Sequence, residues 1–443
     1  MESKSLELQI EIVATKFLEL SPKQEILVIS HFDTDGITSA AIMTQTLKKM
    51  DRRFSVKILK RIEEETISEL PKDKAILFLD LASGSLDNLV KANLKDVFII
   101  DHHELTQAVP ENIFMVNPQL NGKEELSSSS LVYLFCKHLI KENTEFAKLA
   151  ILGMIGDSME KSIDKLNNLI LNDGDIKRKR GLLIYPSTRP LNRALEYCSD
   201  PYIPGITGNT LGVIELLREV GLNPVNGKYK SLIELDENEM SKLVTAIVLK
   251  NPKVRNREIV GDIFLIKFFN KLEDARELSA MINACSRMGD PGTALELCLE
   301  SGKAKKKAEA IHTKYRQVII SGLKSAAESE KIEGEGFVII NARQKIKDTV
   351  IGTIASILSN SSVYEEGTMI TTMAYYDDKI KVSARSVGNK GRNIREILAQ
   401  VVNQTGGEVG GHEFAAGCMI KQDKETEFLS LLKKSFEIEF VKM

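Results

Sequence analysis

The tripeptide Asp101-His102-His103 follows directly after a run of apolar and β-branched residues at positions 97–100. An acid and two imidazoles at the tip of a predicted buried strand are costly unless ions or hydrogen bonds satisfy them. Carboxylate oxygens and imidazole nitrogens together suit manganese or a similar first-row ion better than calcium. A ligating imidazole usually donates its other N–H to a carboxylate, so Asp101 is expected to orient a neighbouring histidine. The tripeptide therefore predicts part of a metal site.

Three further groups of acids or histidines follow apolar stretches, and we expect them to end strands in the same way. They are HFDTDG at residues 31–36, the aspartate of FLDL at residue 80, and GMIGD at residues 153–157. If HFDTDG is extended, His31, Asp33 and Asp35 share one side, and Gly36 permits a sharp break into a helix. The simpler alternative is an aspartate N-cap, but a cap needs one acid and this segment has two acids and a histidine.

Asp80 and Asp157 complete the predicted site. Asp80 alone would more often cap a short helix, but beside HFDTDG in a parallel sheet its two oxygens could bridge two metals. Gly156 would let the backbone approach closely, so that Asp157 completes the second metal site. The four groups together predict one site for two divalent ions.

The elements that must position these residues alternate along the first 160 residues. Apolar runs predict strands at residues 26–30, 54–59, 75–79, 97–100 and 113–116, with helices at 39–50, 85–92 and 127–140. This order predicts an α/β fold with a doubly wound parallel sheet, in which ligands bind beyond the carboxyl ends of the strands.

The rest of the chain divides into a middle region and a second α/β region. Residues 161–330 are predicted to be mostly helical, with irregular connections at prolines and a long connecting helix at 304–327. A new pattern then predicts a strand at 337–341, a helix at 351–358, and strands at 369–376 and 379–386 joined by a turn at Asp377-Asp378. We expect a catalytic domain at 1–190, a mostly helical insert and connecting helix at 191–330, and a smaller α/β domain at 331–443.

Composition excludes several functions. The chain has 443 residues, 43% of them hydrophobic and 28% charged, and a formal net charge of −2, so no global charge attracts nucleic acid. Basic clusters at 177–180 and 303–307 are interpreted as solvated surface rather than nucleic-acid contacts. No apolar run approaches the roughly 20 residues that span a membrane. Five cysteines without CxxC spacing argue against structural zinc and, with a charged N-terminus, favour a cytoplasmic location.

The order HFDTDG, FLDL, DHH and GMIGD over residues 31–157 resembles the DHH phosphoesterase superfamily. The resemblance implies two ions, Mn²⁺ or else Mg²⁺, and makes Asp101 and His103 the expected catalytic residues, with His103 facing the substrate phosphate. One ion would be held by His31, Asp33 and Asp80. The other would be held by Asp35, Asp80, His102 and Asp157.

A second resemblance lies near the C-terminus. The segment GGEVGGHEFAAG at 406–417 resembles the GGGHxxAAG signature of the DHH-associated DHHA1 substrate-binding domain, with two glycines where the family often has three. Gly410, Gly411 and His412 are the candidates there, since a glycine-rich loop can wrap backbone N–H groups around a phosphate, although a plain turn is the alternative. Arg385, in a segment that resembles the S-x-R-S strand of that domain, could clamp a phosphate or form a surface ion pair.

Residues 278–289 resemble the L-N-A-x-G-R-x-G stretch of RecJ-type single-strand nucleases, with Ser286 in place of the usual glycine. Asn283 and Arg287 are candidates for terminal-phosphate contacts, against the alternative of a capped helix with a surface arginine. The sequence PYIPGI at 201–206 resembles the archaeal branch of that group.

These resemblances imply an exonuclease that releases mononucleotides from single-stranded DNA in the 5′ to 3′ direction, in replication or repair. Two alternatives stay open. The first is hydrolysis of RNA, short oligoribonucleotides or cyclic dinucleotides. The second is a replisome scaffold that partners a helicase accessory complex, a partner that is also open for a nuclease.

Overall fold

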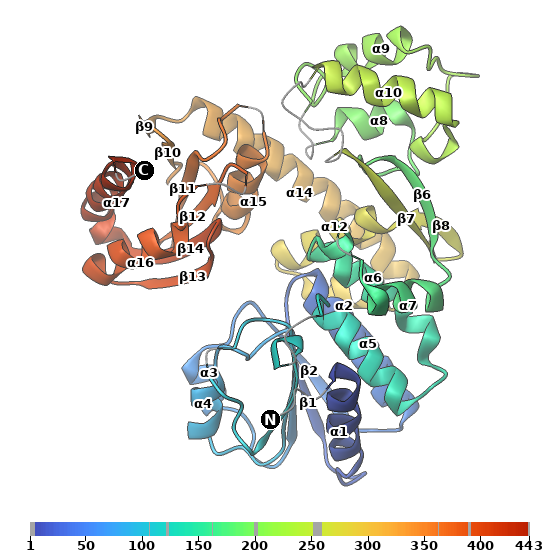
Figure 1. The fold of residues 1–443 in the computed structure, drawn as a ribbon, viewed down its shortest axis with the longest axis vertical. Coiled ribbons are helices and arrows are strands. Elements are labelled where there is room, and N and C mark those ends of the chain that lie inside the picture. The colour runs from blue at the N-terminus through green and yellow to red at the C-terminus, as the bar shows by residue number, and fades with distance from the viewer. Residues whose placement is uncertain are drawn as a thin grey trace. The chain divides into compact units, whose positions relative to one another are not determined.

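The computed structural model describes residues 5–105, 107–120, 124–161, 163–198, 203–250, 259–361, 363–388 and 391–441. They form two compact units (Figure 1). Unit 1 comprises Met1–Lys179 and Asp262–His312, and unit 2 comprises Arg180–Gly261 and Thr313–Met443. Pro201 and Tyr202 of the PYIPGI segment lie outside the described residues.

Unit 1 is built on a five-stranded sheet with the order β2-β1-β3-β4-β5, in which every neighbouring pair is parallel. The strands are β1 Ile26–His31, β2 Phe54–Leu59, β3 Ala75–Leu79, β4 Val97–Ile100 and β5 Ile113–Val116. Every residue of β3 and β4 is buried, as expected for central parallel strands covered on both faces. The predicted doubly wound sheet is confirmed, with strand bounds within one residue of those predicted.

Alternate strand residues enter different hydrophobic clusters on the two faces of this sheet. Leu77 and Phe98 belong to the larger cluster, and Phe78 and Ile99 belong to the smaller one. The larger cluster includes residues from α1 Leu6–Leu18, α2 Thr34–Lys49, α5 Ser128–Leu139 and α6 Ala147–Gly156, and from α7 Lys165–Asp173. The smaller cluster includes residues from α3 Glu64–Ser68 and α4 Leu86–Lys91.

Helix α2 begins five residues earlier than the sequence pattern predicted. Asp33 caps it by accepting a hydrogen bond from the Gly36 N–H at 3.0 Å, so HFDTDG enters a helix instead of remaining extended. Only glycine fits at position 36, because a Cβ there would lie 2.3 Å from the His31 carbonyl oxygen. The expectation that His31, Asp33 and Asp35 share one side of an extended segment is therefore wrong.

The middle of the chain is largely helical, as predicted, but its described residues also include three strands that the pattern did not predict. The helices are α8 Leu191–Glu196, α9 Thr210–Glu219, α10 Glu237–Lys250, α12 Ala275–Arg287, α13 Pro291–Cys298 and the long α14 Gly302–Glu328. The strands β6 Lys177–Leu182, β7 Val260–Phe268 and β8 Lys271–Asp274 form a small sheet in the order β6-β7-β8. Strand β6 contains the basic cluster at 177–180, which is mostly solvent-exposed, as the interpretation of a solvated surface requires.

The C-terminal part of unit 2 is a six-stranded sheet with the order β13-β14-β12-β11-β10-β9. Its strands are β9 Lys331–Gly334, β10 Phe337–Asn341, β11 Met369–Tyr376, β12 Lys379–Ser386, β13 Glu408–His412 and β14 Ala415–Lys421. Its helices are α15 Asp348–Ser359, α16 Ile394–Thr405 and α17 Glu425–Val441. The predicted hairpin at 369–386 is present, with Asp377 at a positive φ of 50° in its turn.

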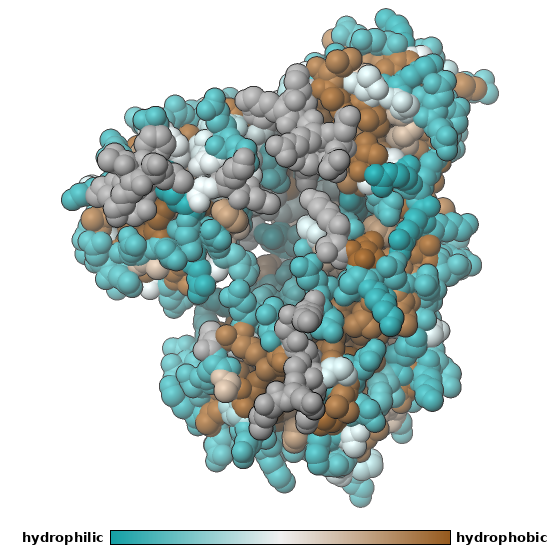
Figure 2. Space-filling view, viewed as in Figure 1, coloured by the Kyte–Doolittle hydropathy of each residue, from teal (hydrophilic) through white to brown (hydrophobic). Residues whose placement is uncertain are grey.

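Hydrophilic side chains cover most of the face visible in Figure 2. Among the helices that the structure describes, none is long and apolar enough to cross a membrane.

Candidate metal centre

Three neighbouring strands carry the predicted ligands at their carboxyl ends. Strands β1, β3 and β4 are adjacent in the parallel sheet, and they lead into His31, Asp80 and Asp101 respectively. Because the ends of parallel strands meet at one edge, residues that are 70 positions apart in the sequence come together there. The sheet topology therefore assembles the site.

The first group joins a histidine to an aspartate at the start of α2. The Nδ1 of His31 lies 2.9 Å from Asp33 Oδ2, while Asp33 Oδ1 caps the helix. Burial opposes the charged form of Asp33, but the adjacent imidazole outweighs it and holds the pKa of this carboxyl below its usual range. The two interpretations of Asp33 are thus compatible, since one oxygen caps the helix and the other lies in the cluster.

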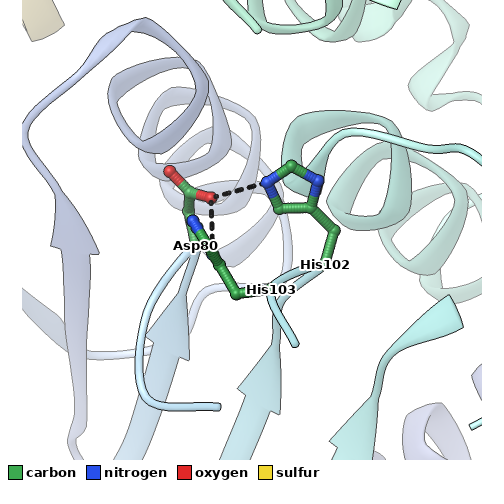
Figure 3. Close-up of side chains that lie close together, drawn as sticks. All are labelled: Asp80, His102 and His103. Carbon is green, nitrogen blue, oxygen red and sulfur yellow. Dashed lines mark ion pairs between the residues drawn. The ribbon is translucent and has the colours of Figure 1, made fainter. Parts of the chain in front are cut away.

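Asp80 is the central carboxylate of the site, and Figure 3 shows its side chain facing those of His102 and His103. Only 1% of the Asp80 side chain is exposed. Its oxygens lie 3.4 Å from His31 Nδ1, 3.6 Å from His102 Nε2 and 3.8 Å from His103 Nδ1. These distances exceed hydrogen-bond length, and neither oxygen has a hydrogen-bond partner among the described residues. Burial, followed by the charges of nearby carboxylates, raises the pKa of Asp80 well above its usual range. A buried carboxylate without donors is the arrangement that a bound cation would stabilise.

Asp101 has a different environment, because donors surround it. It accepts hydrogen bonds from the Ser83 N–H at 3.1 Å and the His102 N–H at 2.9 Å, and its Oδ1 lies 2.7 Å from His103 Nδ1. Burial opposes its charged form, but His103 outweighs it, so the pKa of Asp101 is held below its usual range. The same contact with Asp101 raises the pKa of His103. Asp101 is thus placed to orient the imidazole of His103.

Asp35 and Asp157 reach the centre from helices. Both oxygens of Asp35 accept backbone hydrogen bonds from the first turn of α5, from Ser128 at 2.7 Å and Ser129 at 2.9 Å. Asp157 is the C-cap of α6, and its Oδ2 lies 3.2 Å from His102 Nε2. The expectation that Asp157 ends a strand is wrong, because the apolar run before it is a buried helix. Gly156 makes the expected close approach, since a Cβ there would lie 2.8 Å from Thr34 Cβ.

These side chains fit divalent cations. Their donor atoms form three groups, each with all atoms within 4.8 Å of one another: His31, Asp33 and Asp80; Asp80, His102 and His103; Asp35, His102 and Asp157. Atoms bonded to one ion at about 2.0–2.2 Å lie about 3 Å apart, which is close to the shortest spacings here. The donors are oxygen and nitrogen, a mixture suited to Mn²⁺. The assignment of individual ligands to two ions stays a prediction.

Sequence analysis missed Asn117, which is fully buried directly after β5. Its side-chain amide donates to the His103 carbonyl at 2.9 Å and to Ser83 Oγ at 3.1 Å. It therefore links the backbone of His103 to Ser83, whose N–H donates to Asp101. The sequence contains the pattern that would have identified Asn117, because this residue follows its strand just as Asp80 and Asp101 follow theirs.

Asn283 and Arg287 both lie on α12, one turn apart. The Nε of Arg287 donates to Asn283 Oδ1 at 3.0 Å, and both side chains are partly exposed. They form a polar pair in unit 1, and a role in phosphate binding stays a prediction.

The C-terminal candidates do not form the expected loop. Gly410, Gly411 and His412 are exposed on edge strand β13, where Gly410 pairs with Gly417 and Gly411 with Ala416. The expectation of a glycine-rich loop is wrong. A side chain would not fit at Gly411, because a Cβ there would lie 2.4 Å from the Ala415 carbonyl oxygen.

Arg385, on β12, donates to Ser356 Oγ at 3.1 Å and to the Ala384 carbonyl at 2.8 Å. Its guanidinium is therefore held against helix α15 and its own sheet.

Three family models match separate parts of the chain. The model of the DHH family, N-terminal domain, matches residues 25–155, and that of the DHHA1 domain matches residues 335–437. The model of the DHH-CID domain matches residues 184–257.

Two similar proteins cover nearly the whole chain. An uncharacterized protein of Methanocaldococcus jannaschii is 30% identical over 424 residues, which are 91% of each protein. The single-stranded-DNA-specific exonuclease RecJ of Bacillus subtilis is 23% identical over 94% of this chain. The chain spans 46% of the length of that enzyme.

Two solved structures share the fold. An exonuclease RecJ bound to manganese matches 98% of this chain and 94% of its own, with 16% identity and a TM-score of 0.60. CDC45 from Entamoeba histolytica matches 99% of each chain, with 12% identity and a TM-score of 0.67.

Proposed function

Since the chain belongs to the DHH phosphoesterase family and is related to RecJ, we propose that it is a two-metal exonuclease that hydrolyses single-stranded DNA. It would release mononucleotides from the 5′ end, in DNA replication or repair. The observation that carries this proposal is Asp80, a buried carboxylate with three imidazole nitrogens around it and no hydrogen-bond donor of its own among the described residues.

The protein residues divide the work at this centre. When bound, a pair of divalent ions supplies positive charge to the scissile phosphate and lowers the pKa of water. His31, Asp33 and Asp80 would hold one ion, and Mn²⁺ is the expected metal, with Mg²⁺ as the alternative. The second ion would be held by Asp35, Asp80, His102 and Asp157.

Asp101 orients His103 and favours its protonated form, because their side chains lie 2.7 Å apart. His103 is also the most exposed of these groups, with 47% of its side chain accessible. It is therefore the residue proposed to meet a substrate phosphate and to donate a hydrogen bond to it.

The choice of single-stranded DNA rests on the RecJ relative and on polar groups outside the metal centre. Asn283 and Arg287 would contact a terminal phosphate. Arg385, together with the glycine-rich strand and His412, would contact the phosphate backbone. Aromatic residues form only 6% of the chain, so binding would depend on phosphates rather than on base stacking.

The test is product analysis with substrates labelled at one end. Single-stranded DNA and RNA carrying a 5′ or 3′ label, and a cyclic dinucleotide, are incubated with the protein in Mn²⁺ or Mg²⁺. We expect labelled mononucleotide to appear at once from 5′-labelled DNA, while 3′-labelled DNA shortens stepwise. Rapid cleavage of only the cyclic dinucleotide or of short RNA would refute the exonuclease assignment and favour the alternative hydrolase.

A second candidate is a scaffold subunit of a replication complex that binds a helicase accessory complex. The similarity in fold to CDC45 favours keeping this candidate. The complete ligand set argues against a role without catalysis. A metal-loaded wild-type protein that cleaves none of the substrates above would favour the scaffold.

A further inference from the structure

Helix α12 (Ala275–Arg287) lies outside all three spans that match family models, yet it belongs to the same compact unit as the metal centre. It packs against α6, which ends at Asp157, and against α2, which begins beside Asp33. A segment more than 100 residues downstream of the last predicted ligand therefore touches the two helices that deliver acids to the site.

The first contact joins three chain segments at one point. Thr34 lies between Asp33 and Asp35, and its hydroxyl donates to the Ser279 carbonyl of α12 at 3.0 Å in a buried position. Gly156, the residue before Asp157, packs against the Thr34 methyl group so closely that a Cβ would have no room. The Ser279 hydroxyl would lie 3.5 Å from that same Cβ. The start of α2 and the end of α6 thus lie together against α12.

The second contact is an ion pair one turn earlier on the helix. Arg276 donates to Glu160 Oε1 at 3.1 Å, and only 16% and 9% of the two side chains are exposed. Glu160 is in the short 3₁₀ turn Met159–Lys161, which is separated from Asp157 by Ser158 alone. This pair therefore ties α12 to the segment that carries the last ligand of the second ion.

A site of this kind needs such restraints, because four carboxylates at short range repel one another. Asp33 and Asp80 share one group of donor atoms, and Asp35 and Asp157 share another. The charges of Asp33, Asp35 and Asp157 all raise the pKa of Asp80. Charges buried together favour any movement that separates them until cations arrive. Residues that fix the loops in advance reduce the reorganisation needed for metal binding, and such outer contacts typically affect metal affinity about 10–100-fold.

We propose that α12 is a positioning element of the metal centre, in which the Arg276–Glu160 pair and the Thr34–Ser279 hydrogen bond hold the Asp33–Asp35 and Asp157 segments at metal-binding distance. Arg276 is thereby a positioning residue rather than a metal ligand. The inference rests on the proposed function for the presence of the ions. It goes beyond that function because it assigns the integrity of the centre to a segment that none of the matched family models includes.

A matched ion pair in the same unit separates positioning from ordinary stabilisation. Lys305 lies 3.0 Å from Glu273, with side chains 20% and 10% exposed. This pair has nearly the same length and burial as Arg276–Glu160, but it joins α14 to β8, and neither of these two elements carries a predicted ligand. Lys305→Gln therefore measures what the loss of a comparable pair does to the fold alone.

The experiment titrates Mn²⁺ into the full-length wild-type protein and variants by calorimetry, and records Tm in EDTA. We expect Arg276→Gln to weaken Mn²⁺ binding about 10–100-fold, and Arg276→Lys to recover part of the loss. Lys305→Gln should keep the wild-type Mn²⁺ affinity within about two-fold, although each variant loses one largely buried ion pair and should show a similar fall in Tm. If Arg276→Gln does not fold, Glu160→Gln breaks the same pair and replaces it in the comparison.

Wild-type Mn²⁺ affinity in Arg276→Gln or Glu160→Gln would overturn the inference. An equal loss of affinity in Lys305→Gln would also overturn it, because the effect would then come from general stability. Failure of the wild-type protein itself to bind Mn²⁺ would instead refute the proposed function.

Discussion

The metal centre in unit 1 and the glycine-rich strand in unit 2 differ in how their side chains are held. At the metal centre, Asp35, Asp80 and Asp101 are almost fully buried, and backbone N–H groups fix two of them. On β13, Gly410, Gly411 and His412 are exposed on an edge strand.

The difference matches what the two proposed ligands require. An ion that stays bound needs donors fixed in advance, since every ångström of misplacement reduces its affinity. A nucleic-acid strand must be released and moved after each cleavage, and exposed backbone and side chains can bind it weakly and repeatedly. We therefore expect substitutions of the acids at the metal centre to abolish function and substitutions on β12 and β13 to weaken it.

The largest effect is expected for Asp80→Asn. Removal of this charge should lower kcat by more than about 1000-fold, since Asp80 is the residue proposed to hold both ions. The free energy of unfolding in EDTA should stay equal or rise by about 1–3 kcal/mol, because a buried carboxylate without donors is destabilising. Chemical denaturation and a turnover assay measure the two quantities.

Asp87→Asn provides the control, because Asp87 is an exposed acid on α4. It should keep both activity and stability at wild-type values. Retained turnover in Asp80→Asn would break the comparison, since the buried centre would then be structural.

A smaller loss is expected for Asn117→Ala. The variant removes the hydrogen bonds to Ser83 and the His103 carbonyl, so the DHH backbone is less well fixed. We expect turnover to fall about 10–100-fold and the free energy of unfolding to fall by about 1–3 kcal/mol, because buried polar groups lose their partner. Wild-type kinetics in Asn117→Ala would mean that Asp101 alone holds the tripeptide.

Arg385→Ala and His412→Ala should have still smaller effects. We expect KM for single-stranded DNA to rise about ten-fold or less, because one phosphate contact contributes about 1.4 kcal/mol. Neither kcat nor Mn²⁺ affinity should change by more than about two-fold. Arg343→Ala is the control, since Arg343 is a largely exposed arginine of the same unit. Unchanged KM in both variants would assign the strand a structural role.

The smallest effect concerns the dependence of binding on salt. Loss of Arg385 should reduce the slope of log affinity against log salt concentration by about 0.7 to 1, because one counterion fewer is released. Asn117→Ala should keep the wild-type slope, since Asn117 is buried and uncharged. Equal slopes for all variants would remove Arg385 from the nucleic-acid interface.

Local pattern predicted the sheet of unit 1 well, and it pointed to acids and histidines that the structure brings together at one edge of that sheet. Strands such as Ala75–Leu79 are short apolar runs between polar segments. Acids at the ends of such buried strands are costly unless ions or hydrogen bonds satisfy them, so they indicate a site. The RecJ-like relationship is confirmed by the family models and the relatives. Pattern failed where periodicity was ambiguous: the apolar run 147–156 suits a buried helix or a strand, and Asp157 follows a helix.

Long-range packing explains the other differences. The basic strand β6 has no apolar alternation, so only its pairing in the sheet makes it a strand. The role of Ser279 as an acceptor for Thr34 depends on a contact across 245 positions, which no local pattern contains. Asn117, in contrast, could have been predicted from the sequence, because it directly follows β5.

The proposed function requires two ions around Asp80. Calorimetric titration of metal-free protein with Mn²⁺ measures their number, with Asp80→Asn as the comparison. We predict two Mn²⁺ per wild-type chain and, in Asp80→Asn, the loss of at least one of them with a weaker second. Binding of one ion or none by the wild type, or two ions with unchanged affinity in Asp80→Asn, would contradict the account.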